Sequence, residues 1–429
     1  MNGYPAMVIH HPPGPQWRAM TIGIDDPGDL TAYLPPSGGH AWIRRGDGMV
    51  GIGEIARFEG GTAAEADEWW QEACGRIEQE TELPEVPGTG PIAFASFAFD
   101  PGHSSEASIV IVPRVVIGRR NGQSWLTVIG ATNLPLPGMP DQAQRPAEPQ
   151  GVTEVGTSLG RSDWQDIITE AVGRIGRGEL DKVVLARGVT LASQTPLDPN
   201  WLVMALVATY PTCWTYHVEG LVGASPEMLI RLEGGLATSR VLAGTIRRNG
   251  GEELDLKLAH GLARSSKNLI EHELAVESVA RALAPFCSGM NVPDAPYVLE
   301  LPNVLHLASD VTAVVHPGVT ALRLAGELHP SAAVCGTPTP AARAAIAELE
   351  HLDRGRYSGP VGWLDSSGDG EFAIALRCGF VHADDPRRIT LYAGCGIVEE
   401  SDPGEEFAET EAKLMPMLEA LGVPAPRQH

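Results

Sequence analysis

The first third of the chain contains apolar, β-branched runs that are too short for helices. The segments 91–100 (PIAFASFAFD) and 107–118 (ASIVIVPRVVIG) are of this kind, and such runs bounded by Gly and Pro are typical of buried strands. An uncharged run, Val86 to Phe99, is only 14 residues long and includes Gly and Pro. We therefore expect a strand with its turn there, because a membrane-spanning helix needs about 20 apolar residues.

This pattern is interrupted by a proline-rich segment. Residues 133–160 contain five prolines and few large apolar side chains, a composition typical of an exposed connector. The segment separates an N-terminal part, residues 1–132, from the region 161–429, in which the chemically distinctive residues lie.

A helix and a strand are predicted directly after the connector. Ser162 is the candidate N-cap of the helix, and Gly178 is its predicted stop. The strand that follows begins KVVLA, with Lys182 on the same face as Val184 and Ala186. Lys182 therefore either extends to solvent at the strand end or is desolvated for a chemical purpose.

Near the C-terminus the pattern returns to a helical period. Asp402 is the predicted N-cap and Pro403 the first helical residue. Glu406, Glu409 and Lys413 then share one face. Two interpretations are open: a solvated face with acids near the positive end of the helix dipole, or a site for a hard cation such as Mg²⁺.

Charge and composition exclude several kinds of partner. The 429 residues carry a formal net charge of −23, which argues against binding to nucleic acid or to an anionic membrane surface. No secretory signal is visible at the N-terminus. The six cysteines show no paired spacing, which is typical of reduced thiols in a cytoplasmic protein.

Eight further motifs occur in order between residues 162 and 421. They are GASPEMLIRL (223–232), LAGTIRR (242–248), SSKNLIEHELAV (265–276), HLASDV (306–311), LHPSAAVCGTP (328–338), RGRYSGPVGW (354–363), EFAIALR (371–377) and YAGCGIVEESDPGEEFAETEAKL (392–414). Together they resemble the chorismate-utilising enzymes, a family that comprises isochorismate, salicylate, anthranilate and aminodeoxychorismate synthases. The resemblance implies one large α+β domain in which two facing antiparallel β-sheets carry helices on their outer sides. It also implies a monomer.

The resemblance assigns chemical roles to individual residues. Lys182 matches the general base of the water-adding members, and Glu227 of the SPE motif matches the general acid. Glu271 and Glu409 match the carboxylates that bind Mg²⁺, with Glu406 contacting the metal through water. The positions that match chorismate-binding residues are Gly244, Thr245, His306, Ala333, Tyr357, Arg377, Gly394, Gly396 and Lys413.

Three positions choose among the family members. Lys182 stands where anthranilate synthases have glutamine, and Ala243 stands where aminodeoxychorismate synthases have a nucleophilic lysine. Water is thus the expected nucleophile, and no glutamine amidotransferase subunit is expected. Ala333 occupies a position where salicylate synthases typically have threonine.

The resulting prediction is a Mg²⁺-dependent isochorismate synthase with chorismate as its substrate. Two alternatives stay open: a salicylate synthase, which would go on to eliminate pyruvate, and a non-catalytic binding module on the same scaffold. The sequence does not choose between menaquinone, siderophore and salicylate biosynthesis as the consumer of the product.

Overall fold

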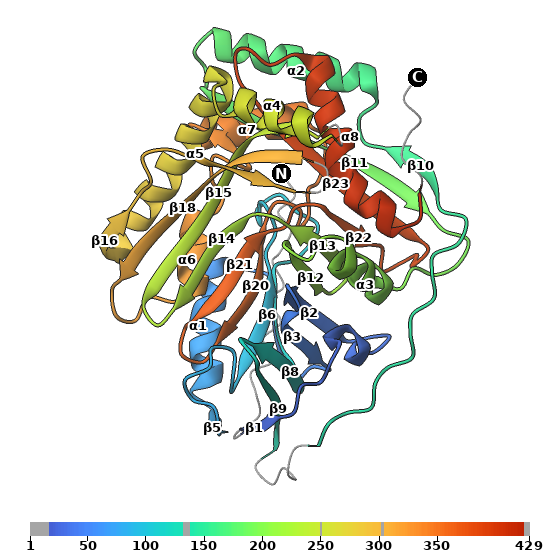
Figure 1. Ribbon diagram of the computed structural model, residues 1–429, viewed down its shortest axis with the longest axis vertical. Helices are drawn as coiled ribbons and strands as arrows, with labels where there is room; N and C mark the ends of the chain where they lie inside the picture. Colours follow the sequence, from blue (N-terminus) through green and yellow to red (C-terminus); the bar gives the residue numbers. More distant parts are fainter. Residues whose placement is uncertain (1–16, 132–137, 249–250, 302–303, 424–429) are drawn as a thin grey trace.

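The computed structural model describes residues 17–131, 138–248, 251–301 and 304–423 (Figure 1). The side chains of Thr245, Arg247, Glu252 and Lys267 are outside this description. Thr245, a predicted substrate-binding residue, is therefore placed only by its backbone, which pairs with His306.

Two large sheets dominate the described chain, and the first has 13 strands. Its order is β10 (Thr153–Thr157), β11 (Lys182–Ala192), β23 (Arg388–Ile397), β22 (Cys378–Val381), β13 (Leu221–Ser225), β12 (Trp214–Val218), β2 (Gly39–Arg44), β3 (Asp47–Ile52), β8 (Val115–Arg120), β9 (Gln123–Ala131), β1 (Trp17–Ile24) and β5 (Ile77–Thr81). The short strand β19 (Gly336–Thr337) pairs with β11. Every pairing is antiparallel except β1 with β5, which is parallel.

The second sheet has ten strands among the described residues. Its order is β16 (Cys287–Asn291), β18 (Val304–Val315), β15 (Leu236–Arg247), β14 (Met228–Glu233), β21 (Gly370–Ile374), β20 (Pro360–Asp365), β6 (Ile92–Ser96), β7 (Ile109–Val112) and β4 (Ala56–Glu59), while β17 (Tyr297–Glu300) pairs with β18. Both apolar runs of the first third form strands here, since β6 and β7 fall within them.

The two sheets face each other across a shared aromatic core. Trp42 and Trp214 of the first sheet pack in one buried cluster with Phe94 and Trp363 of the second. Each sheet combines strands from before and after the segment 133–160, and the end of that segment supplies β10. The predicted α+β architecture of two facing sheets is confirmed; the subdivision into 1–132, 133–160 and 161–429 stays a prediction.

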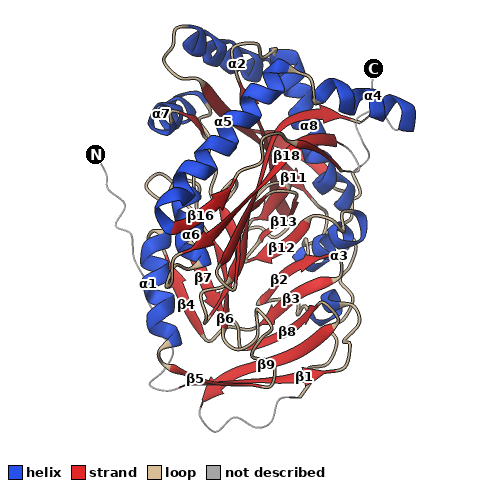
Figure 2. Ribbon diagram, turned by 60° about the vertical axis from the view of Figure 1, so that its left-hand side comes forward, coloured by secondary structure: helices blue, strands red, loops and turns tan. Residues whose placement is uncertain are grey.

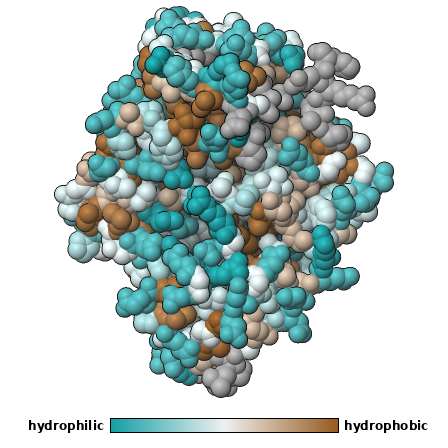
Figure 3. Space-filling model, in the orientation of Figure 1, coloured by the Kyte–Doolittle hydropathy of each residue, from teal (hydrophilic) through white to brown (hydrophobic). Residues whose placement is uncertain are grey.

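The helices lie on the outer sides of the sheets (Figure 2). They are α1 (Ala63–Cys74), α2 (Arg161–Gly176), α3 (Pro199–Thr209), α4 (Glu252–Leu262), α5 (Ser266–Leu283), α6 (Ala321–Leu328), α7 (Thr339–Leu349) and α8 (Pro403–Ala420). Helices α5 and α6 contact the second sheet, whereas α3 and α8 contact the first. No helix among the described residues is long and apolar enough to cross a membrane. Hydrophilic side chains cover most of the face in Figure 3, in keeping with the high net charge.

The start of α2 differs from the prediction. The helix begins at Arg161 and its N-cap is Gly160, so Ser162 lies in the first turn and the predicted N-cap is wrong. Asp163 closes the turn instead, because its Oδ2 accepts the Gly160 N–H at 3.3 Å. Gly178 follows the helix end with a φ of 73°, in the left-handed region, which agrees with a glycine stop.

Candidate active site

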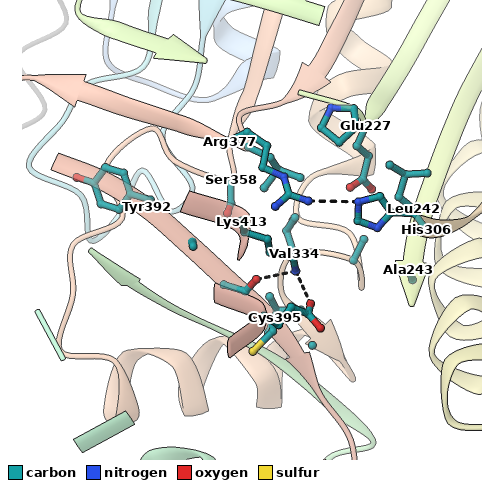
Figure 4. A pocket seen from close by; sticks show the side chains of 18 of the residues that line it. Glu227, Leu242, Ala243, His306, Val334, Ser358, Arg377, Tyr392, Cys395 and Lys413 are labelled. Atoms are coloured by element: carbon teal, nitrogen blue, oxygen red, sulfur yellow. Dashed lines mark hydrogen bonds and ion pairs between the residues drawn. The ribbon is translucent and has the colours of Figure 1, made fainter. Parts of the chain in front are cut away.

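A cavity between the two sheets gathers most of the predicted site residues. It encloses about 660 Å³, and Figure 4 shows side chains converging on it from both sheets and from α8. Eleven predicted residues line it: Glu227, Gly244, Glu271, His306, Ala333, Tyr357, Arg377, Gly394, Gly396, Glu409 and Lys413. Lys182 and Glu406 are not part of the lining.

Lys182 lies directly behind the cavity wall. It is the first residue of β11 and is fully buried, so the solvent-extended interpretation of this lysine is wrong. Its Nζ is 3.1 Å from Oε1 of Glu271, which does line the cavity. Gly396 on the paired strand β23 makes room for this pair, because a side chain there would collide with the Glu271 carboxylate and press on the lysine.

Helix α5 presents Glu271 to the cavity and is fixed by the next residue. Buried His272 has Nδ1 3.3 Å from the Ala243 carbonyl oxygen and Nε2 2.8 Å from the Ser309 hydroxyl. These partners lie on β15 and β18, so one imidazole connects the helix to two strands. His272 thus anchors the part of α5 that carries Glu271.

Glu227 is a buried acid at the cavity wall. It follows β13 in the SPE motif and only 5% of the residue is exposed. Burial raises the pKa of the Glu227 carboxyl to about 8, although a backbone hydrogen bond from Leu242 and the charges of Lys182, Lys413 and Arg377 act in the opposite direction. The side chain therefore carries its proton at neutral pH.

Arg377 and His306 form a pair beside Glu227 (Figure 4). Nη2 of Arg377 lies 3.2 Å from Nε2 of His306, and because a guanidinium can only donate, Nε2 accepts. Burial and the charges of Arg377 and Lys413 hold the pKa of His306 well below its ordinary value, so the ring is neutral. Nη1 of Arg377 is buried without a hydrogen-bond partner. The free donor is available to an anionic ligand.

The backbone at Arg377 is unusual. Its φ of 50° lies in the left-handed region, which a non-glycine residue adopts at a cost of about 1–3 kcal/mol. Ser358, another lining residue, has a φ of 63°. Such conformations concentrate at functional sites, and here both are adjacent to motif residues of the cavity.

Helix α8 supplies a second cation to the cavity, Lys413. Asp402 caps the helix as predicted, accepting from the Gly404 and Glu405 N–H groups. Lys413 Nζ lies 2.6 Å from Glu409 Oε1 and donates to the Gly394 carbonyl oxygen at 2.8 Å. Burial opposes the charged form of Lys413, but the Glu409 carboxylate outweighs it, and the pKa of Lys413 is raised.

The acids predicted to bind metal are only partly brought together. Glu271 and Glu409 line the same cavity, whereas Glu406 is buried in the first turn of α8 and outside the lining. No group of three acidic, His or Cys side chains placed to hold a metal ion occurs in the described parts of the chain. Two cavity carboxylates nevertheless fit Mg²⁺, which keeps several waters and binds through one or two protein carboxylates.

Some lining residues were not predicted. Among these residues of the cavity wall are Leu242, Ser358, Tyr392 and Cys395. Tyr392 stacks on Tyr357 with ring centroids 5.1 Å apart. A signal for Tyr392 was present, because it shares its strand face with Gly394 and Gly396 on β23. Ser358 directly follows Tyr357 in the RGRYSGPVGW motif, and this position was its signal.

Comparison with known proteins gives a consistent result. The family model described as chorismate binding enzyme matches residues 41–422. The isochorismate synthase MenF of Bacillus subtilis is 32% identical over 410 residues, covering 87% of this chain and 85% of that protein. The isochorismate synthase DhbC of the same organism is 38% identical over 273 residues, covering 61% and 68%. The structure of the menaquinone-specific isochorismate synthase MenF from Escherichia coli matches with a TM-score of 0.78 and 26% identity, covering 96% of both chains.

Proposed function

Since this chain belongs to the family of chorismate binding enzymes, we propose that it is an isochorismate synthase. The observation that carries the proposal is a protonated acid, Glu227, in one cavity with an unpaired guanidinium, that of Arg377. Chorismate is a dianion, so it requires a cation such as the guanidinium. Its 4-hydroxyl group must leave, so it also requires an acid that donates a proton.

The reaction adds water at C2 of chorismate while the 4-hydroxyl departs and the ring double bonds shift. Lys182, in its uncharged form, takes a proton from the attacking water, and Glu227 donates its proton to the departing hydroxyl oxygen, so one water enters and one water leaves. General acid catalysis and general base catalysis each contribute about 10²–10⁴-fold to the rate. Lys182, fully buried, is kept away from bulk water, and Glu227 is held protonated by its burial.

The two substrate carboxylates need separate partners. Arg377, with its free Nη1, binds the enolpyruvyl carboxylate in a two-pronged manner. Glu271 and Glu409 would hold Mg²⁺, which would supply positive charge for the ring carboxylate. Their present partners are Lys182 and Lys413, and both contacts would change when the metal binds. Glu406, buried and outside the cavity lining, stays a predicted ligand that contacts the metal through water.

The remaining predicted residues shape the cavity for the ring. His306, Tyr357 and Lys413 provide polar contacts, and Gly244, Gly394 and Gly396 let backbone groups approach the substrate. Thr245, whose side chain is outside the described part, stays in this set as a prediction from the motif.

Isomerisation is favoured over pyruvate elimination by one wall residue. Ala333 lines the cavity, and its methyl group offers no hydroxyl where salicylate synthases typically carry threonine. Ala243, also in the lining, leaves no amine to attack the ring. Because water is the nucleophile, we expect no amidotransferase subunit. The family resemblance favours a monomer, and the six free cysteines favour the cytoplasm.

Product analysis tests the proposal. The purified protein is incubated with chorismate, with Mg²⁺ or with EDTA, and the products are separated by chromatography. We expect isochorismate in the presence of Mg²⁺ and none with EDTA. Salicylate plus pyruvate as the main products would replace the isomerase with the lyase, and no turnover in either condition would favour a binding module.

A further inference from the structure

The strand β11, which begins with Lys182, is paired along only part of one edge. On that edge β19 pairs with Lys182 and Val183, and β10 pairs with β11 from Val189 to Ala192. Between these two stretches, no strand of the described chain lies against residues 184–188 on this edge. The backbone groups that face the gap need other partners, because a buried peptide group without a hydrogen bond is costly.

A buried ion pair lies in this gap. Glu350 is the C-cap of α7, Arg354 follows it by four residues, and both are almost completely buried. Oε1 of Glu350 accepts the N–H of Ala186 at 2.8 Å. Nη2 of Arg354 donates to the carbonyl oxygen of Val184 at 2.7 Å. The two side chains thus bond to the edge of β11 as a neighbouring strand would.

The same arginine is bonded to other parts of the active-site wall. Nη1 of Arg354 donates to the Val334 carbonyl oxygen at 2.9 Å. Val334 and its neighbour Ala333 line the cavity, and so does Val184. The Arg354 carbonyl oxygen accepts the N–H of Tyr357, a further lining residue, at 3.0 Å. One residue therefore connects three segments of the wall that are distant in sequence or belong to different elements.

The ion pair is itself outside the cavity and firmly held. Neither Glu350 nor Arg354 belongs to the lining. Nε of Arg354 donates to Oε2 of Glu350 at 2.9 Å, Nη2 also bonds to Oε1, and the guanidinium lies 4.2 Å over the ring of Phe99. Each of the three guanidinium nitrogens therefore has an acceptor in the protein. The pair acts on the site through the backbone that it holds.

The position of Lys182 depends on that backbone. Lys182 lies two residues before Val184 on β11, so the two side chains share a strand face. A shift of β11 against the segment of Ala333 and Val334 would move the base relative to the ring of the substrate. A misplacement of about 1 Å in a reacting group can cost about 10²-fold in rate.

We propose that Glu350 and Arg354 are positioning residues of the isomerisation, whose ion pair fixes the strand of Lys182 against the wall that contains Ala333. The inference rests on the proposed function, since it takes Lys182 to be the base. The pair forms no bond to Arg377 or to the predicted Mg²⁺ ligands. Its loss should therefore lower kcat and leave substrate and metal binding nearly unchanged.

Steady-state kinetics of the full chain with chorismate and Mg²⁺ test the proposal, with isochorismate separated by chromatography as the readout. Arg354→Lys keeps a positive charge beside Glu350, but one nitrogen replaces three and cannot bond to the carboxylate and both carbonyl oxygens. We expect kcat to fall about 10–100-fold, with KM and the Mg²⁺ concentration for half-activation within about 2-fold of the native values. Glu350→Gln, which still offers an oxygen to Ala186 but no charge to Arg354, should lower kcat in the same way.

Glu371→Gln is the matched control for the loss of a buried carboxylate. Glu371 is buried, accepts the Nε1–H of Trp42 at 2.9 Å and pairs with Arg231 at 2.9 Å, but does not line the cavity. This variant should lose stability in urea, as Glu350→Gln does, and keep the native kcat.

If Arg354→Lys does not fold, the nearly isosteric Glu350→Gln decides. An unchanged kcat in the folded variant, a raised KM with unchanged kcat, or an equal fall of kcat in Glu371→Gln would each overturn the positioning role while leaving the proposed function intact. Absence of turnover in the native protein would instead overturn the proposed function, and this inference with it.

Discussion

Replacing Glu227 by Gln should change both the rate of isomerisation and the pH dependence of stability. The pKa of Glu227 is raised from 4.5 to about 8 by burial, so between these values the folded protein holds a proton that the unfolded chain has lost. Stability therefore falls as pH rises through this range, by about 1.4 kcal/mol per pH unit from this group. Glutamine cannot ionise, so the variant does not lose this stability as pH rises.

The expected magnitude follows from the size of the shift. The free energy of unfolding of Glu227→Gln, relative to that of the native protein, should increase from about pH 4.5 to about pH 8 and then level off. The total increase has an upper bound of about 5 kcal/mol. Isomerisation should drop by about 10²–10⁴-fold, and the native enzyme should lose activity above about pH 8 as the acid deprotonates.

Urea unfolding of both proteins at pH 5, 6, 7, 8 and 9, with chorismate turnover measured in parallel, provides the assay. Glu405→Gln, an exposed glutamate on the first turn of α8, controls for the substitution itself and should retain turnover. A stability difference between Glu227→Gln and the native protein that does not vary with pH would refute the argument that burial keeps this acid protonated.

Three further substitutions address the other roles. Lys182→Ala should abolish isomerisation while chorismate still binds, measured by calorimetry; unchanged turnover would exclude it as the base. Arg377→Gln should raise KM for chorismate about 10-fold or more, because a charged hydrogen bond contributes about 1.5–3 kcal/mol; an unaltered KM would remove it from the carboxylate site. Glu409→Gln should shift half-activation to a higher Mg²⁺ concentration, and an identical Mg²⁺ titration would contradict its role as a ligand.

Local patterns predicted the elements well where one periodicity dominates. Strand parity placed Lys182 among apolar residues, and the structure buries it completely. The cap and first turn of α8 are as predicted at Asp402 and Pro403. At α2 the same reasoning failed, because a glycine without a side chain took the N-cap position and Asp163 closed the turn.

Contacts between distant segments could not be read from spacing. Nothing in the local sequence brings Glu271 of α5 to within 3.1 Å of Lys182 on β11; only the family motifs pointed to it. Helical spacing put Glu406 on the same face as Glu409, but Glu406 is buried and does not line the cavity, whereas Glu409 does.

The central claim is that water attacks chorismate at C2 in the cavity formed by Glu227, Arg377 and their neighbours. Incubation with chorismate and Mg²⁺ in water enriched in the heavy oxygen isotope, followed by mass spectrometry of the separated product, tests it most directly. The proposed mechanism predicts isochorismate that carries one heavy oxygen, at C2. Isochorismate without the label, or salicylate as the main product, would contradict it.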